Sequence, residues 1–476
     1  MHIRQKLKLF QINSNKLDMQ RRKFINRTAL GTAAMVGFPT IVPVHVLGKD
    51  APSNKINIGQ IGCGRIAMSH DIVDTLNFEE ARIMSVCDID SIRAKKAKVY
   101  IDKAYQEKTG KAKYMDTKIY DDYREMLLNT DIDAVMISTP DHWHSQPAME
   151  AALAGKDIYL QKPTSLTVRE GQQLRKAVQD ANVILQVGTQ QRAMPQFRVA
   201  AELVRNGRIG KVHTVKIGLP GDPPGSEAPI MPIPSNLNFD MWLGSTPEVP
   251  YTEIGVHPQA DYSRPGWLRQ RNYGAGMITG WGQHHYDSAA WGMNTELTGP
   301  MTVEALAEFP KSGLWNVHGD FMVKHEYDTG MTVYTSGGYT NGIQYIGEDG
   351  WIFVSRGSYQ ASASDPIDLE KSSKALNASD PKLLESVIGA DEIHLEKIDD
   401  QHGNWLECIK TRRQPISPIE KGHKACVTCL ISDIAMQLDR KLEWDNDKEL
   451  FVNDSEANAM LHREQRKPYG TDYVIR

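Results

Sequence analysis

The segment GAGMITGWGQHHYD, residues 274–287, places His284 and His285 side by side, with Asp287 three positions after the first. Neighbouring histidines can bind a metal ion, act in acid/base catalysis or simply pack in a core. If the residues from 284 onward form a helix, His284 and Asp287 share one face. His285 then points about 100° away, because an α-helix has about 3.6 residues per turn. The spacing favours His284, backed by Asp287, as an acid/base and disfavours a metal site. The spacing does not decide whether His285 packs in a core or contacts the substrate.

A second chemical motif is the glycine-rich turn GCGRIA at residues 62–67, between a predicted strand that begins at residue 56 and a predicted helix over 66–76. Glycines in such a turn let backbone N–H groups approach a pyrophosphate at the helix N-terminus. Asp88 stands near the end of the next predicted strand, 81–90, where a carboxylate can hold both ribose hydroxyls and repel a 2′-phosphate. The pattern predicts a dinucleotide site that prefers NAD(H) to NADP(H).

Two further motifs follow the next predicted strands. TPDHWH, residues 139–144, ends the strand over 133–140, and QKP, residues 161–163, ends the strand over 157–163. In a doubly wound sheet the carboxyl ends of the strands line the cofactor crevice. Lys162 can donate a hydrogen bond to a substrate oxygen there, with a pKa lowered by partial burial. Taken alone, a lysine in such a loop is more often simply solvated.

The elements that must position these motifs alternate between strand-like and helical runs. This alternation predicts an α/β fold, with a doubly wound parallel sheet over residues 55–190. Residues 191–476 hold longer strand-like runs, among them a hairpin over 342–355, and predict a second α/β domain on a mostly antiparallel sheet. Residues 360–400 are polar and weakly patterned, which indicates an insertion or a long loop.

The order of these motifs, nucleotide-binding turn, CDID, STPDHWH, QKP and a segment ending in GxHxxD, resembles the Gfo/Idh/MocA oxidoreductase family over about residues 55–470. The resemblance implies a Rossmann domain and a C-terminal α/β domain whose large open sheet mediates a homodimer or homotetramer. It also implies an NAD(P) cofactor and a sugar, cyclitol or glycoside substrate. In this family, Lys162 and His284 would be the catalytic residues.

The same resemblance assigns other site residues. Those expected to contact the cofactor are Gly62, Gly64, Arg65, Ile66, Asp88, Thr139, Pro140, His142, His144, Gln161, Lys162 and Gln190. Those expected near the substrate are His285, Asp287, Trp281, Tyr273 and Arg192. Two positions depart from the family: Gln161 replaces the glutamate of EKP, and Gly280 stands where the catalytic aspartate is usual. The active site would therefore depend more heavily on His284 and Lys162.

Aromatic residues and arginines are dense between residues 242 and 281. Aromatic faces stack on the C–H surfaces of sugars while arginines bind hydroxyls, so the segment predicts a carbohydrate pocket. Ordinary core packing explains some of these residues equally well. The set comprises Trp242, Tyr251, Tyr262, Trp267, Tyr273, Trp281, Arg264, Arg269 and Arg271.

The first 48 residues hold eight lysines and arginines and one aspartate, whereas the whole chain has a net charge of −4. A basic stretch, QRRKFI at 20–25 and a mildly apolar run at 29–44 give the layout of a twin-arginine export signal, with Arg21 and Arg22 as the pair. A disordered basic tail is the alternative. The signal predicts a periplasmic protein exported in the folded state. Free NAD is scarce outside the cytoplasm, so the cofactor is expected to be tightly held.

Composition narrows the class of protein further. No apolar stretch reaches the roughly 18 residues of a membrane span, and no basic block lies outside the N-terminus. Neither a spanning helix nor a nucleic-acid partner is expected. The five cysteines are odd in number and irregular in spacing, unlike a disulfide framework. Cys426 and Cys429 form a lone CxxC in a helical pattern over 423–438, which favours buried helix cysteines over zinc, and no metal is expected.

The sequence thus predicts an exported NAD(H)-dependent oxidoreductase that acts on a hydroxyl or keto group of a sugar or glycoside. The nearest alternative is a redox-neutral, NAD-dependent glycosidase that works through a 3-keto intermediate and elimination. A second alternative, which the Gly280 departure raises, is a non-catalytic sugar-binding protein that contains NAD.

Overall fold

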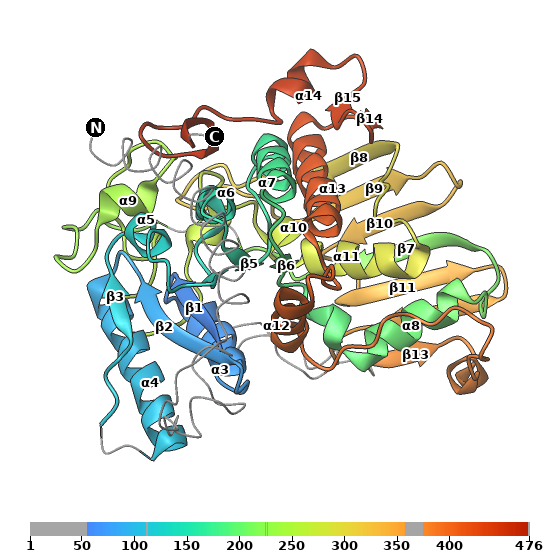
Figure 1. Cartoon of the computed structure of the whole chain (residues 1–476). Helices are drawn as coiled ribbons and strands as arrows, with labels where there is room; N and C mark the ends of the chain where they lie inside the picture. The colour runs from blue at the N-terminus through green and yellow to red at the C-terminus, as the bar shows by residue number, and fades with distance from the viewer. Residues whose placement is uncertain (1–54, 111–112, 224, 226, 358–374, 475–476) are drawn as a thin grey trace, which may run out of the picture. The chain divides into compact units, whose positions relative to one another are not determined.

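The computed structural model describes residues 55–110, 113–223, 225, 227–357 and 375–474, so the predicted export signal at residues 1–48 lies outside the described residues. The described chain forms a six-stranded and a nine-stranded sheet with helices packed against both (Figure 1). Within those ranges, no helix is both long and apolar enough to cross a membrane.

The first sheet is parallel throughout, in the order β3-β2-β1-β4-β5-β6. Its strands are β1 (Ile56–Ile61), β2 (Ala81–Cys87), β3 (Lys118–Tyr120), β4 (Ala134–Ile137), β5 (Asp157–Leu160) and β6 (Leu185–Val187). Short apolar runs such as AVMI in β4 are buried along their whole length, because helices cover both faces of a parallel sheet. The predicted doubly wound parallel sheet is confirmed.

Helices pack on each side of this sheet in two separate apolar layers. One layer contains the π-helical turn η2 (Ala67–Asp71) with α3 (Ile72–Thr75), and α4 (Ser91–Thr109). The other contains α5 (Tyr123–Leu127), α6 (Ser145–Leu153) and α7 (Val168–Ala181). The strand order reverses between β1 and β4, so the loops after these two strands open the crevice in which such sheets bind ligands.

The second sheet is mixed, in the order β13-β12-β11-β7-β10-β9-β8-β14-β15, and only its β10–β7 pair is parallel. The predicted mostly antiparallel sheet is therefore confirmed, including the hairpin at residues 347–350. Its strands are β7 (Val212–Gly218), β8 (Thr302–Ala307), β9 (Phe321–Glu326), β10 (Thr332–Ser336), β11 (Gly342–Gly347), β12 (Gly350–Val354), β13 (Leu376–Ala378), β14 (Leu442–Asp445) and β15 (Leu450–Phe451).

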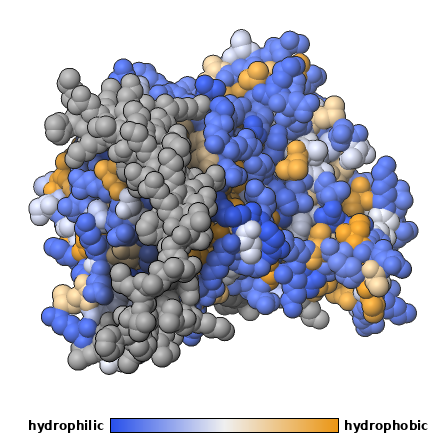
Figure 2. Space-filling model, in the orientation of Figure 1, coloured by the Kyte–Doolittle hydropathy of each residue, from blue (hydrophilic) through white to orange (hydrophobic). Residues whose placement is uncertain are grey.

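Three helices cover one face of this sheet: α8 (Pro195–Arg205), α11 (Gly282–Met293) and α13 (Ile419–Leu438). Cys426 and Cys429 lie buried on α13, as expected for core cysteines. The outer surface over α7 and α13 is largely hydrophilic, and hydrophobic side chains gather nearer β13 (Figure 2). These helices therefore turn apolar faces inward and hold α11, the helix of the two histidines, against the sheet.

The helix α12 (Gln401–Thr411) lies within the predicted second domain but packs on the first sheet. Trp405, Leu406 and Cys408 are all buried in the same apolar layer as residues of β1, α3 and α4. The prediction that residues 191–476 form one separate domain is corrected in this respect, because this amphipathic helix buries its apolar side against the Rossmann strands.

The remaining helical segments are short and lie in connections: η3 (Asp141–Trp143), η4 (Gln190–Ala193), α9 (Phe239–Leu243), η5 (Trp267–Arg269), α10 (Met277–Gly280), η7 (Pro381–Glu385), α14 (Ser455–Ala459) and η8 (Thr471–Tyr473). Of the polar region 360–400, the part after residue 374 forms β13, η7 and a loop, and that loop ends beside the candidate site. Residues 358–374 lie outside the described residues.

Candidate active site

The glycine-rich turn joins the end of β1 to the helical turn that begins at Arg65. Gly62 has φ of +83°, a left-handed conformation that strains any residue with a side chain. A Cβ at this position would also meet the carbonyl oxygen of Ser138 at 2.7 Å, so the turn packs directly on the end of β4. The N–H of Gly62 donates to the carbonyl oxygen of Cys87, and Gly62, Gly64, Arg65 and Ile66 line the cavity in front of the turn.

Asp88, directly after β2, is tied to this turn by its carboxylate. Oδ2 accepts a hydrogen bond of 2.6 Å from the backbone N–H of Cys63, and Oδ1 accepts one of 2.8 Å from the N–H of Asp90. The side chain stays partly exposed to the cavity in front of the turn. A carboxylate held here is positioned to accept hydrogen bonds from the two hydroxyls of a ribose.

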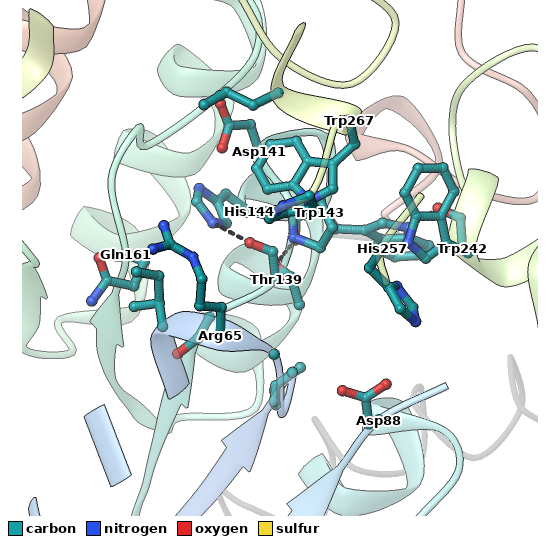
Figure 3. A pocket seen from close by; sticks show the side chains of 18 of the residues that line it. Arg65, Asp88, Thr139, Asp141, Trp143, His144, Gln161, Trp242, His257 and Trp267 are labelled. Carbon is teal, nitrogen blue, oxygen red and sulfur yellow. Dashed lines mark hydrogen bonds between the residues drawn. The ribbon is translucent and has the colours of Figure 1, made fainter. Parts of the chain in front are cut away.

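A first cavity lies in front of the turn, and eleven of the predicted site residues line it. They are Gly62, Gly64, Arg65, Ile66, Asp88, Thr139, Pro140, His144, Gln161, Lys162 and Trp281. Arg65, Asp88, Thr139 and His144 surround one pocket in Figure 3. The predicted cofactor residues that follow β1, β2, β4 and β5 are thus brought together.

His142 is the exception among the residues of TPDHWH. Its ring is buried, Nε2 lies 2.8 Å from the carbonyl oxygen of Trp242, and it does not line the cavity. The prediction that His142 contacts the cofactor is corrected, because the 3₁₀ turn η3 points this ring into the aromatic cluster around Trp242 and Tyr273. Tyr273, predicted near the substrate, is a buried member of that cluster as well.

Lys162 reaches from the end of β5 to α10, where its Nζ donates a 2.6 Å hydrogen bond to the carbonyl oxygen of Gly280. Gly280 is the position where the family has an aspartate. At this position Lys162 is bonded to a backbone carbonyl, which bears no net charge. A Cβ at position 280 would lie 3.2 Å from Cδ2 of Leu268, a contact that a flexible side chain can relieve.

Gln161 faces a buried carboxylate. Its Nε2 donates a 2.8 Å hydrogen bond to Oδ1 of Asp71, whose Oδ2 accepts a 2.5 Å bond from Oγ of Ser138. Nε2 of His402 lies 3.3 Å from Oδ1 of the same, fully buried Asp71. A glutamate at position 161 would place two carboxylates against each other, so glutamine is the residue that fits this chain. This chain lacks the glutamate of EKP, but a carboxylate, that of Asp71, is hydrogen-bonded to the glutamine that replaces it.

His284 lies in the first turn of α11, buried, beside a second cavity. Its Nδ1 has no hydrogen-bond partner among the described residues. Burial, followed by the positive charges of Arg356 and Lys162, holds the pKa of His284 well below its usual range. The ring is therefore neutral at neutral pH and ready to accept a proton.

Both ring nitrogens of His285 lie within hydrogen-bonding distance of polar side chains. The side-chain amide of Gln191 lies 3.2 Å from Nδ1, and Oδ1 of Asn341 lies 2.7 Å from Nε2. Burial lowers the pKa of His285 to about 4. With both nitrogens engaged and the residue absent from the linings of both cavities, His285 is a packing residue rather than a substrate contact.

Asp287 does not support His284. Its two carboxylate oxygens accept bonds of 2.7 and 2.9 Å from the guanidinium of Arg192, which also donates a 2.8 Å bond to Glu296. Arg192 lies in η4 and is 1% exposed, with Trp291 stacked 5.1 Å away. Asp287 and Arg192 were both predicted to lie near the substrate. That prediction is corrected, because the helix face is shared as expected but the carboxylate is neutralised by Arg192 of η4.

The second cavity lies against the first and shares part of its wall. The shared residues are Arg65, Ile66, Gln161, Lys162, Arg264, Gly280 and Trp281. The second cavity is lined further by the predicted residues His284 and Gln190, and by Arg356, Asp399, Asp400 and His402 among others. Lys162 thus faces the nucleotide side and the His284 side at once, which suits a group that acts where cofactor and substrate meet.

Only part of the aromatic segment faces these cavities. Trp242, Trp267, Trp281 and Arg264 line the first cavity, as a carbohydrate pocket requires. Tyr251 and Tyr273 are core residues, and Tyr262 lies under the guanidinium of Arg93. Arg269 and Arg271 pair with Asp222 and Asp433. The first group thus lines a cavity and stays a prediction as a carbohydrate pocket, whereas the others are occupied by apolar or ionic partners.

Sequence reasoning missed several residues that line the two cavities. Asp141 lies inside the TPDHWH motif, where its charge was a visible signal. Arg356, Asp399 and His402 come from segments after β12 that carry no motif, so no local pattern marked them. Among the described residues, no group of three or more histidines, cysteines and acids is arranged to hold a metal ion.

Comparison with known proteins identifies similarities over both parts of the chain. Residues 56–189 match the Gfo/Idh/MocA oxidoreductase family, NAD-binding Rossmann fold, and residues 225–471 match the C-terminal alpha/beta domain of this oxidoreductase family.

Among curated proteins, myo-inositol 2-dehydrogenase of Thermotoga maritima is 29% identical over 165 residues, which cover 34% of this chain and 44% of that protein. A glycosyl hydrolase family 109 protein of Shewanella baltica is 28% identical over 167 residues, which cover 32% of this chain and 35% of that protein. The matches thus span less than half the length of these relatives.

Among solved structures, the WlbA dehydrogenase from Chromobacterium violaceum, crystallised with NADH and UDP-GlcNAcA, superposes with a TM-score of 0.55. It is 18% identical, and the match covers 86% of this chain and 99% of that one. At this identity the likeness shows the fold alone.

Proposed function

Because the chain belongs to the Gfo/Idh/MocA oxidoreductase family and contains its NAD-binding Rossmann domain, we propose that it interconverts a hydroxyl and a keto group of a sugar or glycoside. One observation carries the proposal. Lys162, from the nucleotide-binding sheet, lies in the wall shared by the two cavities, and neutral His284 lines the cavity on the far side.

The residues in front of β1 and β2 fit NAD(H). The glycine turn lines the crevice with Gly64, Arg65 and Ile66 at the start of a helix, where a pyrophosphate would bind, and Asp88 offers a carboxylate to a ribose. Thr139, Pro140 and His144 line the same cavity together with Lys162. When bound, NAD supplies the hydride acceptor, or NADH the donor, for the reaction.

His284 and Lys162 divide the proton chemistry between them. In the oxidation direction, neutral His284 takes the hydroxyl proton of the substrate as the C–H bond is broken. Lys162 donates a hydrogen bond to the same oxygen and stabilises the negative charge that develops on it. In the reverse direction, protonated His284 returns the proton to the alcohol oxygen.

A sugar-like substrate is supported by the lining of the cavities and by the relatives. Trp281 and Trp267 offer flat apolar faces, and Arg264 offers a fork of hydrogen-bond donors. Proteins similar to this chain include a myo-inositol 2-dehydrogenase and a dehydrogenase crystallised with a nucleotide sugar. A polyhydroxylated ring is the substrate class that these features share.

The experiment that tests this function begins with mass spectrometry of the denatured protein for bound NAD(H), followed by a screen of sugars and glycosides. We expect His284→Ala and Lys162→Ala to lose turnover of the substrate found while retaining NAD binding. Turnover that is the same in both variants as in the wild type would refute the catalytic assignment and favour a non-catalytic sugar-binding protein.

A redox-neutral glycosidase is the second candidate, supported by the similarity to a glycosyl hydrolase family 109 protein. Such an enzyme would oxidise C3 of the sugar, remove the C2 proton as the aglycone leaves C1, add water across the resulting double bond and reduce the ketone again, so that its NAD is recycled. Incubation with aryl glycosides separates the two candidates. Release of the aryl alcohol without net reduction of NAD would replace the dehydrogenase with the glycosidase.

We also propose export by the twin-arginine route, with NAD tightly held, and assembly as a homodimer or homotetramer. The paired Arg21 and Arg22 support export. Outward-facing apolar side chains on the second sheet, such as Leu306 at 65% exposed, support assembly. Replacement of both arginines by lysine should retain the protein in the cytoplasm. Light scattering of the purified protein measures the assembly.

A further inference from the structure

The first cavity has a wall that does not come from the Rossmann sheet. Asp88 and Arg93 line the cavity from the loop and helix after β2, whereas His257 and residues 263–265 line it from the second half of the chain. Figure 3 shows His257 on the same side of the pocket as Asp88. The match to the NAD-binding fold of the family ends at residue 189, so His257 and residues 263–265 lie outside it.

These wall residues belong to a segment, residues 236–265, that we call the strap. The start of the strap pairs with the loop after β2. Leu237 forms an antiparallel bridge with Asp90, and backbone hydrogen bonds of 2.9 and 3.0 Å lie on either side of the bridge. The strap therefore begins in contact with the residues that follow Asp88 in the chain.

The side chain of Asp90 binds the strap at two further points. Oδ1 accepts a 2.8 Å hydrogen bond from Nδ2 of Asn236, and Oδ2 lies 3.0 Å from Nε2 of His257. Burial would raise the pKa of Asp90, but the hydrogen bonds from His257 and Asn236 outweigh burial and hold this pKa below its usual range. The carboxylate is therefore charged at neutral pH, which strengthens hydrogen bonds to it.

Arg93, in the first turn of α4, binds the last part of the strap. Its Nη2 donates hydrogen bonds of 2.8 and 3.2 Å to the carbonyl oxygens of Pro258 and Asp261. The guanidinium carbon lies 4.8 Å from the centroid of the Tyr262 ring. Because Arg93 also lines the cavity with Asp88, the strap is attached beside the carboxylate that would hold a ribose.

The middle of the strap is attached to η3. The carbonyl oxygen of Trp242 lies 2.8 Å from Nε2 of His142 and accepts a 3.0 Å hydrogen bond from Nε1 of Trp143. Both tryptophans line the same cavity. The strap is thus bonded to the segments that follow β2 and β4, the two strands that flank β1 in the sheet.

We propose that the strap completes the NAD site by closing over the adenosine moiety of the cofactor, which must detach the strap before it leaves. Asp88 would hold the ribose, and His257 offers an aromatic ring on which a purine base can stack. This inference deepens the tight retention of NAD under the proposed function, and it depends on NAD binding but not on the sugar chemistry.

The rate of NAD release tests the strap without turnover. Protein loaded with radiolabelled NAD is chased with unlabelled NAD, and the retained label is counted after filtration. In Asn236→Ala we expect release to be about 10-fold faster, because a hydrogen bond to a charged acceptor is lost from the closed strap. Asn236 lines neither cavity, so this effect is not a lost contact with the cofactor.

The matched control is Asn206→Ala, at the C-terminal end of α8. The Asn206 side chain also joins two distant segments, through hydrogen bonds of 2.9 Å to and from the backbone of Ile393, away from both cavities. Its release rate should equal that of the wild type. A release rate of folded Asn236→Ala that also equals the wild-type rate would overturn the proposal.

ADP-ribose tests which end of the cofactor the strap covers, since it carries the adenosine and both phosphates but no nicotinamide. In Asn236→Ala/His257→Ala we expect the Kd values of NAD and ADP-ribose to rise by the same factor, about 10- to 100-fold. Calorimetry measures both constants. A rise for NAD alone would place the strap over the nicotinamide and refute the adenosine assignment.

Hydrogen exchange of the wild type keeps the test decisive if a variant folds poorly. Loading with NAD should slow exchange of the strap amides, among them that of Asn238, which donates to the carbonyl oxygen of Ile89. Strap exchange that is equal with and without NAD would overturn the proposal. A wild type that binds NAD but turns over no sugar refutes the proposed function, whereas the release and exchange results still decide the role of the strap.

Discussion

At the scale of single residues, the chemistry of the site depends on which side chains are charged and which are neutral. Lys162 is bonded to a carbonyl rather than to a carboxylate, and His284 is neutral because it is buried among positive groups. Asp88 lies beside the glycine turn, where burial raises the pKa of its carboxyl group and two backbone N–H groups that donate to it oppose that rise. The acid/base pair and the nucleotide anchor thus lie at separate ends of one crevice.

Asp88 should decide which nicotinamide nucleotide binds. In Asp88→Ser we expect the Kd of NAD(H) to rise about 10- to 100-fold, since hydrogen bonds to a charged acceptor are lost. The Kd of NADP(H) should change less or fall, because the repulsion of its 2′-phosphate is removed. Tryptophan fluorescence titration measures both constants. The control is Asp121→Ser, an exposed acid after β3, and equal changes for the two nucleotides would contradict the assignment.

His284 should act as a base over an unusually wide range of pH. A base works when deprotonated, and the pKa of His284 is lowered by burial and by Arg356 and Lys162. The acid limb of the kcat/KM profile should therefore lie below the ordinary histidine pKa of about 6.5. In His284→Gln we expect kcat to fall about 10²- to 10⁴-fold, the usual share of a general base. An acid limb near pH 6.5 in the wild type would identify a different base.

The residue types at the site could be predicted from the sequence more fully than their partners. The glycine turn, Asp88, Lys162 and His284 follow from local motifs, and the structure places all of them on the two cavities. The partner of Asp287 could not be predicted in the same way. Arg192 is about a hundred residues away in sequence, and helical spacing says which face a carboxylate shares but not what lies opposite it.

At the scale of elements, α11 is fixed by charges rather than by its cap. Trp281, at its N-cap, offers no side-chain hydrogen bond to the helix. Instead, Asp287 is bonded to Arg192 of η4, which is bonded in turn to Glu296 just after the helix. This buried pair therefore joins η4, the turn that follows β6 of the Rossmann sheet, to the helix that carries His284.

Arg192→Met should therefore destabilise the fold. Removal of the guanidinium leaves Asp287 and Glu296 close together without their shared cation, and losing one partner of a buried pair costs about 3–5 kcal/mol. Denaturant unfolding measures the loss. The control is Arg198→Met on α8, whose i,i+4 pair with Glu202 is partly exposed and should matter by at most about 1 kcal/mol. Equal losses in both variants would contradict this role for Arg192.

The elements that the sequence predicted correctly are those with a clear periodic pattern of apolar residues. The alternating runs of the first sheet and the hairpin β11–β12 are clear in the sequence and present in the structure. Shorter elements such as β3, β14 and β15 were missed, because two to four residues show no periodicity. The position of α12 was missed for another reason. Its packing on the first sheet depends on tertiary contacts of Trp405 and Leu406 that no local signal contains.

At the scale of the described chain, buried neutral histidines are unusually frequent. His142 and His325 have pKa values lowered to about 3, and His144 and His285 to about 4, in every case chiefly because burial disfavours the charged form. They lie in both parts of the fold, from η3 to α11 and β9. The unfolded chain returns each of them to an ordinary pKa of about 6.5.

Stability should therefore fall as the solution is acidified below about pH 6.5. Between that value and the lowered pKa of each histidine, the unfolded state binds a proton that the folded state does not, so each contributes up to about 1.4 kcal/mol of destabilisation per pH unit. His402 works in the opposite direction. Although its burial lowers the pKa, Asp71 raises it above the ordinary value overall, so its stabilising share is lost as pH rises.

Denaturant unfolding at pH 7.5, 6.5 and 5.5 would measure the net effect, since six histidines with lowered pKa values, His284 and His423 among them, oppose His402. One buried carboxylate acts against this trend, because burial raises the pKa of Asp141 to about 7 and its folded form therefore gains stability as it takes up a proton in this range. His325→Gln provides the internal check: its ring lies fully buried on β9, 3.0 Å from Oγ of Ser432, and away from both cavities. We expect the variant to lose less stability on acidification than the wild type, by about one histidine's share. An unfolding free energy that is equal at pH 7.5 and 5.5 would mean that these rings reach water and become protonated without unfolding.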